Sequence, residues 1–174
     1  LYYMLTNEAY TGATTFNGYR YWDSKAGKPQ EPIRIEGTHQ ALVTRAQFDL
    51  RTNRLARAYE QRGVAQDDFV MIALPNGIEF YEACVATWKL GATPLPISAK
   101  LPRLERLALI ELAKPKLLVG TSVGDVPGLA TLPVGFEPDA ALSDAALPDR
   151  TALHWKAPTS GGSTGRPKII VAKQ

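Results

Sequence analysis

Phe69-Val70-Met71-Ile72-Ala73-Leu74 is the stretch that decides the fold of this 174-residue chain. All of its residues are apolar, and Pro75-Asn76-Gly77 follows directly as a turn signal. A strand with one face in water alternates polar and apolar side chains, whereas an unbroken apolar run of this length is typical of a strand buried on both faces. The sequence therefore predicts a central, fully buried strand over residues 69–74.

Further strands and helices follow this strand in alternation. Apolar residues recur at helical spacing over residues 78–88, and Gly91 suits the position just after a helix end. A short strand is predicted over residues 93–97, then a helix opened by Pro102, then a strand over residues 116–120. Strands and helices in this order form right-handed crossovers, so the predicted fold class is α/β, with a parallel sheet covered by helices.

A helix is also predicted before the central strand. Thr44-Arg45-Ala46-Gln47 has the spacing of a capping box, and Phe48, Leu55 and Tyr59 recur at helical intervals. Residues 45–62 are thus expected to form an amphipathic helix. Acidic residues interrupt its basic positions and no aromatic residues interleave with them, which favours a solvated face over a nucleic-acid site. The basic positions are Arg45, Arg51, Arg54, Arg57 and Arg62.

A glycine- and hydroxyl-rich stretch, Thr159-Ser160-Gly161-Gly162-Ser163-Thr164-Gly165-Arg166-Pro167-Lys168, lies between apolar runs at residues 152–155 and 169–172. Glycines allow the backbone to approach an anion closely, and hydroxyls with one ammonium complete a phosphate cradle. A flexible linker is the alternative. The stretch ends in a conformationally restricted Arg-Pro-Lys segment and has strand-like runs at both ends. Both features favour the phosphate cradle over the linker. The stretch matches neither the Walker pattern nor the dinucleotide fingerprint.

This loop resembles the phosphate-binding signature of the adenylate-forming superfamily, which includes acyl-CoA synthetases, adenylation domains and luciferases. It departs at Gly161, where the family has a hydroxyl residue, and at Ile169, where it has a glycine. Residues 53–57, 62–64, 70–76 and 88–96 also look like the N-terminal subdomain of acyl-CoA synthetases. The resemblance therefore extends over residues 40–172.

The resemblance implies an ATP-dependent ligase that converts a small-molecule carboxylate into an acyl-adenylate and then an acyl-CoA. ATP, Mg²⁺ and coenzyme A are the cofactors it implies. No catalytic residue and no metal ligand of the family pattern is recognised in this chain, because the family's downstream motifs and its C-terminal lysine do not occur in it. We expect the chain by itself to be inactive. Nucleotide binding is expected from Ser160, Gly161, Gly162, Ser163, Thr164, Gly165 and Lys168.

Two alternatives remain beside the CoA ligase. One is a stand-alone, non-catalytic phosphate-binding or interaction module, and the other is an adenylation domain that loads a carrier protein. The absence of an initiator Met and the end within a predicted strand favour a piece of a longer ligase. A sheet truncated in this way would favour self-association through its open edge.

Composition and charge exclude several classes of function. The chain is 45% hydrophobic and 21% charged, as in ordinary globular proteins, and a net charge of +3 is too weak to indicate nucleic-acid binding. A single cysteine, Cys84, excludes an internal disulfide framework and favours a reducing, cytoplasmic location. Cys84 itself is expected to be a buried, inert thiol. No apolar run reaches the ~20 residues that span a bilayer.

Two domains are predicted. Residues 1–43 form an aromatic-rich N-terminal segment, and residues 44–174 form the α/β part, which ends just after the phosphate loop. Within the α/β part, residues 121–150 are rich in Ala, Pro, Gly and Asp and read as a surface connection with one short helix over residues 140–146. His154 is expected to be a packed or hydrogen-bonded residue.

Overall fold

The structure is a computed structural model that describes residues 14–16, 22–23, 28–29, 33–35, 44–120, 126–160 and 168–173. The chain divides into two compact units, Leu1–Asp49 and Leu50–Gln174. Most of the described residues belong to the second unit, which carries the sheet and the candidate site.

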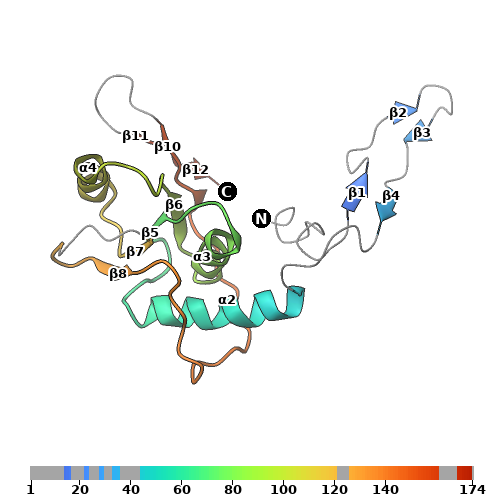
Figure 1. The fold of residues 1–174 in the computed structure, drawn as a ribbon, viewed down its shortest axis with the longest axis horizontal. Coiled ribbons are helices and arrows are strands. Elements are labelled where there is room, and N and C mark those ends of the chain that lie inside the picture. The colour runs from blue at the N-terminus through green and yellow to red at the C-terminus, as the bar shows by residue number, and fades with distance from the viewer. Residues whose placement is uncertain are drawn as a thin grey trace. The chain divides into compact units, whose positions relative to one another are not determined.

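The described residues of the first unit before residue 44 form short antiparallel strand pairs (Figure 1). β1 (Thr14–Phe16) pairs with β4 (Ile33–Ile35), and β2 (Trp22–Asp23) pairs with β3 (Lys28–Pro29).

A parallel sheet forms the centre of the second unit, with strand order β6-β5-β7-β8. Its strands are β5 (Phe69–Ala73), β6 (Thr93–Pro96), β7 (Leu117–Gly120) and β8 (Ala130–Leu132). β5 lies between β6 and β7, and four of its five residues are fully covered. The predicted central strand and its parallel neighbours are confirmed, while β8 is a strand that the sequence analysis missed.

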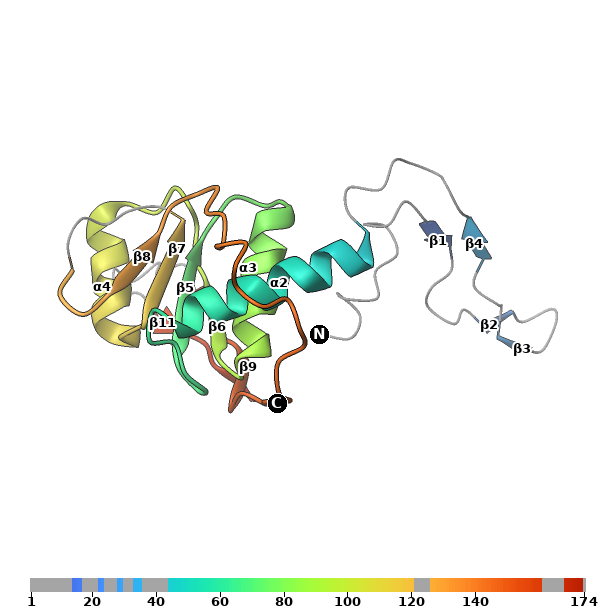
Figure 2. The ribbon, with the colours of Figure 1, turned by 90° about the horizontal axis from the view of Figure 1, so that it is seen from below.

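Helices cover both faces of this sheet (Figure 2). Val70 and Ile72 of β5 point to the face covered by α2 (Arg45–Glu60) and α3 (Ile78–Lys89), where Tyr59 is also fully buried. Met71 and Ala73 point to the opposite face, covered by α4 (Arg103–Ala113). Two separate apolar clusters, one on each face, thus explain why the central strand is apolar at every position. No helix in the described ranges is long and apolar enough to cross a membrane.

The predicted helix ends are also confirmed. The Gln47 amide donates a hydrogen bond to Thr44 Oγ1 at 3.2 Å, and the Thr44 amide donates one to Gln47 Oε1 at 3.2 Å, which is the reciprocal pattern of a capping box. Gly91 follows α3 with a φ of 67°, the left-handed conformation in which glycine is favoured.

Residues 133–151, which make up most of the chain between β8 and β9, run along α2 and are called the strap below (Figures 1 and 2). The short helix predicted over residues 140–146 is wrong, because this segment forms only a turn and bends. A helix would bond its carbonyls to its own amides. The carbonyl groups of the strap instead accept hydrogen bonds from side chains of α2. Asn53 Nδ2 donates to the Asp144 carbonyl at 2.7 Å, Arg54 Nε to the Leu142 carbonyl at 3.2 Å, and Arg57 to the Ala145 carbonyl at 2.8 Å.

Arg51, Arg54 and Arg57 of α2, and Arg62 just after it, are therefore not a solvated face, contrary to the sequence interpretation. Arg51 forms an ion pair with Glu137, and Arg54 Nη2 lies 2.6 Å from Asp144 Oδ2. Arg62 lies 4.9 Å over the ring of Phe136. Nothing in the local sequence distinguishes these arginines from solvated ones, because their partners lie about 80–90 residues further along the chain. The basic face of α2 is therefore packed against the strap.

Candidate functional site

The residues on either side of the glycine-rich loop form an antiparallel hairpin. β9 (His154–Lys156) pairs with β12 (Ala172–Lys173), and β10 (Thr159–Ser160) pairs with β11 (Lys168–Ile169). Ser160 lies directly opposite Lys168 in this register. The two ends of the loop are thus held side by side. The predicted strands on both sides of the loop are confirmed, and the structure adds that they pair with each other.

The base of the hairpin is attached to the outer edge of the parallel sheet. Pro94 and Pro96 alternate along β6 and have no amide hydrogen. The amides of Thr93 and Ile97 point the other way and donate to the carbonyls of Asp68, just before β5, and of Ile72 in β5. The outer edge of β6 therefore offers carbonyl acceptors rather than donors. The Ala157 amide takes up one of them, the Pro94 carbonyl, at 2.9 Å.

Side chains of the sheet and of α3 strengthen this attachment. Thr93 Oγ1 donates to the His154 carbonyl at 2.9 Å, and Trp88 Nε1 donates to the Trp155 carbonyl at 2.5 Å. Ala157 is fully buried in the apolar cluster beneath α4, and Ile169 packs against the same cluster. The strands that carry the loop are consequently anchored to the rigid core from two directions.

Of the predicted nucleotide-binding residues, the structure places Ser160 and Lys168 at the mouth of the hairpin. The Lys168 side chain is exposed there. The loop residues Gly161, Gly162, Ser163, Thr164 and Gly165 lie outside the described residues. Their role, and the role of the Ser160 side chain, stay predictions. An exposed ammonium beside the mouth of a glycine-rich loop is an arrangement that can hold a phosphate group.

Two residues singled out in the sequence have packing roles. Cys84 is buried, and burial raises the pKa of its thiol to about 12, so the thiol stays protonated and is a poor nucleophile. His154 is half-buried on β9, with its Nδ1 atom covered and without a hydrogen-bond partner among the described residues. No group of three or more metal-binding side chains occurs in the described ranges, and no metal ligand is assigned.

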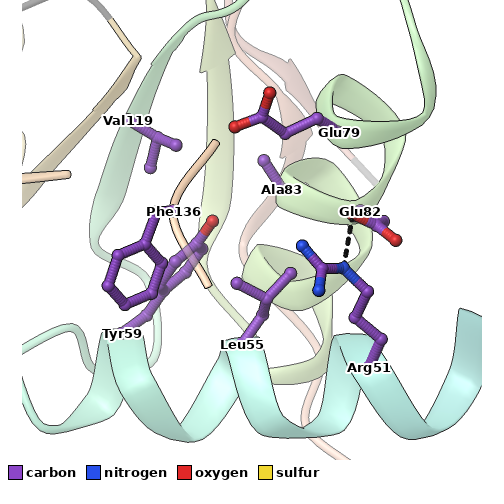
Figure 3. A pocket seen from close by; sticks show the side chains of 8 residues that line it. All are labelled: Arg51, Leu55, Tyr59, Glu79, Glu82, Ala83, Val119 and Phe136. Atoms are coloured by element: carbon purple, nitrogen blue, oxygen red, sulfur yellow. Dashed lines mark hydrogen bonds and ion pairs between the residues drawn. The ribbon is translucent and has the colours of Figure 1, made fainter. Parts of the chain in front are cut away.

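A polar cluster that the sequence analysis missed lies beneath the strap (Figure 3). Arg51 Nε donates to Glu82 at 2.9 Å, and the other guanidinium nitrogens bond the carboxylate of Glu137 on the strap. Burial raises the pKa of Glu82, which is only 4% exposed, while Arg51 opposes this shift. Arg51 lowers the pKa of Glu137. The cluster ties α2, α3 and the strap together.

Three comparisons relate the chain to known proteins. A family model described as "AMP-binding enzyme" matches residues 22–174. Over 148 residues, the chain is 34% identical to a probable non-canonical nonribosomal peptide synthetase, CymA, of Salinispora arenicola. This match covers 77% of the chain and 2% of that protein.

Solved structures show the same fold. ATP-bound MatB from Rhodopseudomonas palustris aligns with a TM-score of 0.65 and 24% identity over 75% of this chain and 29% of that one. A fatty acyl CoA synthetase of Mycobacterium tuberculosis aligns with a TM-score of 0.60 and 19% identity, over 75% and 29% of the two chains. The chain thus spans less than a third of each of these solved relatives.

Proposed function

Because the chain belongs to the family of AMP-binding enzymes, we propose that it is the phosphate-binding part of an enzyme that activates a carboxylate with ATP. The hairpin carries this proposal, since it places Ser160 opposite Lys168 at the two ends of a Gly-Gly-Ser-Thr-Gly-Arg-Pro loop. The same loop sequence carries the resemblance to adenylate-forming enzymes. Membership of the family, in contrast, does not depend on the details of the loop.

The chemistry of adenylation explains why such a loop is needed. The carboxylate attacks the α-phosphate of ATP, an acyl-adenylate forms, and pyrophosphate leaves with increased negative charge. Backbone amides of residues 161–165 would donate to the leaving phosphates, and Lys168 would supply a positive charge. Each charge-assisted hydrogen bond of this kind is worth about 1.5–3 kcal/mol. Mg²⁺ bound to the phosphates would neutralise further charge.

The acceptor of the acyl group is either a carrier-protein thiol or coenzyme A. The 34% identity to a nonribosomal peptide synthetase favours a carrier protein, since adenylation domains of that class load one. The fold shared with a fatty acyl CoA synthetase favours coenzyme A, at the lower identity of 19%. We place the carrier-protein acceptor first and coenzyme A second.

Carboxylate-dependent exchange of pyrophosphate into ATP tests the proposal. The complete polypeptide that contains this chain is assayed with a panel of carboxylates, beside Lys168→Ala and a control, Lys100→Ala, on an exposed turn outside the hairpin. We expect exchange with at least one acid and a loss of about 10–100-fold in Lys168→Ala alone, equivalent to one charge-assisted contact. No exchange with any acid, or equal activity of all three proteins, would contradict the proposal.

The same polypeptide distinguishes the two acceptors. With the activated acid in hand, coenzyme A and a phosphopantetheinylated carrier protein are offered separately, and the thioester is detected by mass. A carrier-bound product supports the first candidate, and an acyl-CoA product supports the second.

A further inference from the structure

The hairpin of β9, β10, β11 and β12 lacks a regular series of backbone bonds to the neighbouring parallel sheet. Among the described residues, a single backbone hydrogen bond joins it to β6, from the Ala157 amide to the Pro94 carbonyl at 2.9 Å. The outer edge of β6 cannot supply a full series, because Pro94 and Pro96 have no amide hydrogen. One bond alone would let β9 pivot about it or slip along the edge.

Three side chains supply the fixation that the backbone does not. Thr93 Oγ1 donates to the His154 carbonyl at 2.9 Å, and the indole of Trp88 donates to the next carbonyl of β9 at 2.5 Å. Asp67 Oδ1 accepts a hydrogen bond from the Leu153 amide at 2.6 Å. These bonds hold three consecutive residues of the hairpin base and come from β6, from α3 and from the turn before β5. Together they select one register for β9.

Thr93 and Asp67 are well prepared for this task. Thr93 has an exposed fraction of 0%, so its hydroxyl is shielded from competing water. Asp67 is exposed, but its backbone has a φ of 67°, a left-handed conformation that aspartate and asparagine adopt more readily than most residues. Its amide donates to the Gly91 carbonyl at 2.8 Å, which holds this conformation. The Asp67 carboxylate is therefore directed at the start of β9.

The place of Lys168 depends on the place of β9. Ser160 pairs with Lys168 across the hairpin, and the Ile170 amide donates to the Pro158 carbonyl at 2.9 Å. These bonds join the strand that leaves β9 to the strand that carries Lys168. A shift of β9 along the sheet would consequently move the Lys168 ammonium with it.

We propose that Thr93 and Asp67 are positioning residues, which fix the register of β9 and thereby hold the Lys168 ammonium against the leaving phosphates. The inference rests on the proposed function, in which Lys168 supplies charge to those phosphates. A displacement of about 1 Å from the productive position can cost about 100-fold in rate, so small shifts of the hairpin matter. The two residues act through Lys168 and need no contact with the nucleotide.

Thr93→Val tests the role of the hydroxyl, because valine keeps the shape and removes the donor. In carboxylate-dependent pyrophosphate exchange by the complete polypeptide, we expect a maximal rate about 3–10-fold lower, with the KM for the carboxylate unchanged. Thr93→Ser keeps the donor and should restore most of the rate. The matched control is Thr87→Val, since Thr87 is equally buried but donates within α3, to the Ala83 carbonyl at 2.8 Å. Equal rates of all these proteins would overturn the proposal.

Combination with Lys168→Ala separates positioning from a general loss of stability. If Thr93 acts through Lys168, Thr93→Val should slow the Lys168→Ala protein by less than about 2-fold. A further loss as large as in the unaltered protein would overturn the proposal. Asp67 offers a second pair if Thr93→Val fails to fold. Asp67→Gly keeps the left-handed backbone without the carboxylate and should be slow, whereas Asp67→Asn keeps both features and should not be.

Hydrogen exchange distinguishes failure of this inference from failure of the proposed function. If the unaltered polypeptide shows no exchange of pyrophosphate with any acid, the proposed function fails, but the register can still be measured. Faster hydrogen exchange of residues 154–160 in Thr93→Val, and not in Thr93→Ser or Thr87→Val, supports the fixation of β9. Unchanged protection of these residues in Thr93→Val overturns it.

Discussion

Replacing Arg51 with Met is expected to destabilise the protein strongly, because it leaves Glu82 buried without its partner. Glu82 is 4% exposed, and its bond to Arg51 Nε is 2.9 Å long. Breaking a buried ion pair by removing one partner costs about 3–5 kcal/mol. Because 30% of the Arg51 side chain is exposed, water screens part of the interaction, and we expect a loss of about 2–3 kcal/mol near pH 8.

The cost should also depend on pH, in a direction that the structure fixes. Burial raises the pKa of Glu82 and Arg51 opposes this shift, so Arg51→Met leaves burial as the main influence. A carboxyl whose pKa is higher in the folded state than in the unfolded state binds a proton more readily when folded. Its contribution to stability is therefore greatest below the unfolded pKa and declines as the pH rises through the folded pKa. We expect Arg51→Met to cost less at pH 5 than at pH 8.

Urea unfolding followed by tryptophan fluorescence at both pH values measures this free energy. The control is Arg51→Met combined with Glu82→Met, which removes both charges and should recover most of the stability, because no buried charge remains. Glu137, whose side chain is 72% exposed, is solvated without Arg51. A single variant that loses under 0.5 kcal/mol, or that responds equally at both pH values, would refute the reasoning, as would a double variant no more stable than the single one.

Three further predictions concern the core and the hairpin. Gly120→Ala should cost more than about 2 kcal/mol in thermal unfolding, because its φ is 109° and an added Cβ would lie 2.4 Å from the Ala73 carbonyl oxygen; a neutral effect would contradict this. Trp88→Phe removes the indole bond to the hairpin, so hydrogen exchange of residues 154–160 should quicken, whereas unchanged protection would mean that the bond does not anchor β9. Cys84 should react with a thiol reagent at pH 8 only after unfolding, since burial raises its pKa to about 12; rapid labelling of the folded chain would show that the site opens.

The fold could be predicted where the signal is local. The central strand is apolar at every position because a different helix layer covers each of its faces, and the capping box and Gly91 mark helix ends through contacts within a few residues. β8 could not be predicted in this way. It is short, one of its residues is exposed, and it exists because β7 offers it an edge.

The site was predictable to a similar extent. Strands on both sides of the glycine-rich loop follow from the sequence, and the pairing of Ser160 with Lys168 follows once those strands form a hairpin. The polar cluster beneath the strap was not predictable. Arg51 and Glu82 look like ordinary surface charges of two helices until α2, α3 and the strap are brought together. Both failures concern contacts between residues far apart in the chain.

The strap is held at three points through its backbone carbonyl groups, which every amino acid has. Asn53, Arg54 and Arg57 bond the carbonyl oxygens of Asp144, Leu142 and Ala145, and these oxygens remain whatever side chain stands at those positions. Leu142 and Ala145 can therefore be substituted without losing these bonds, whereas Asp144 also pairs with Arg54 through its side chain. A change on α2 removes a donor that the strap cannot replace. Divergence between related sequences should consequently be fast along residues 139–147 and slow on the facing turns of the helix, although both lie at the protein surface.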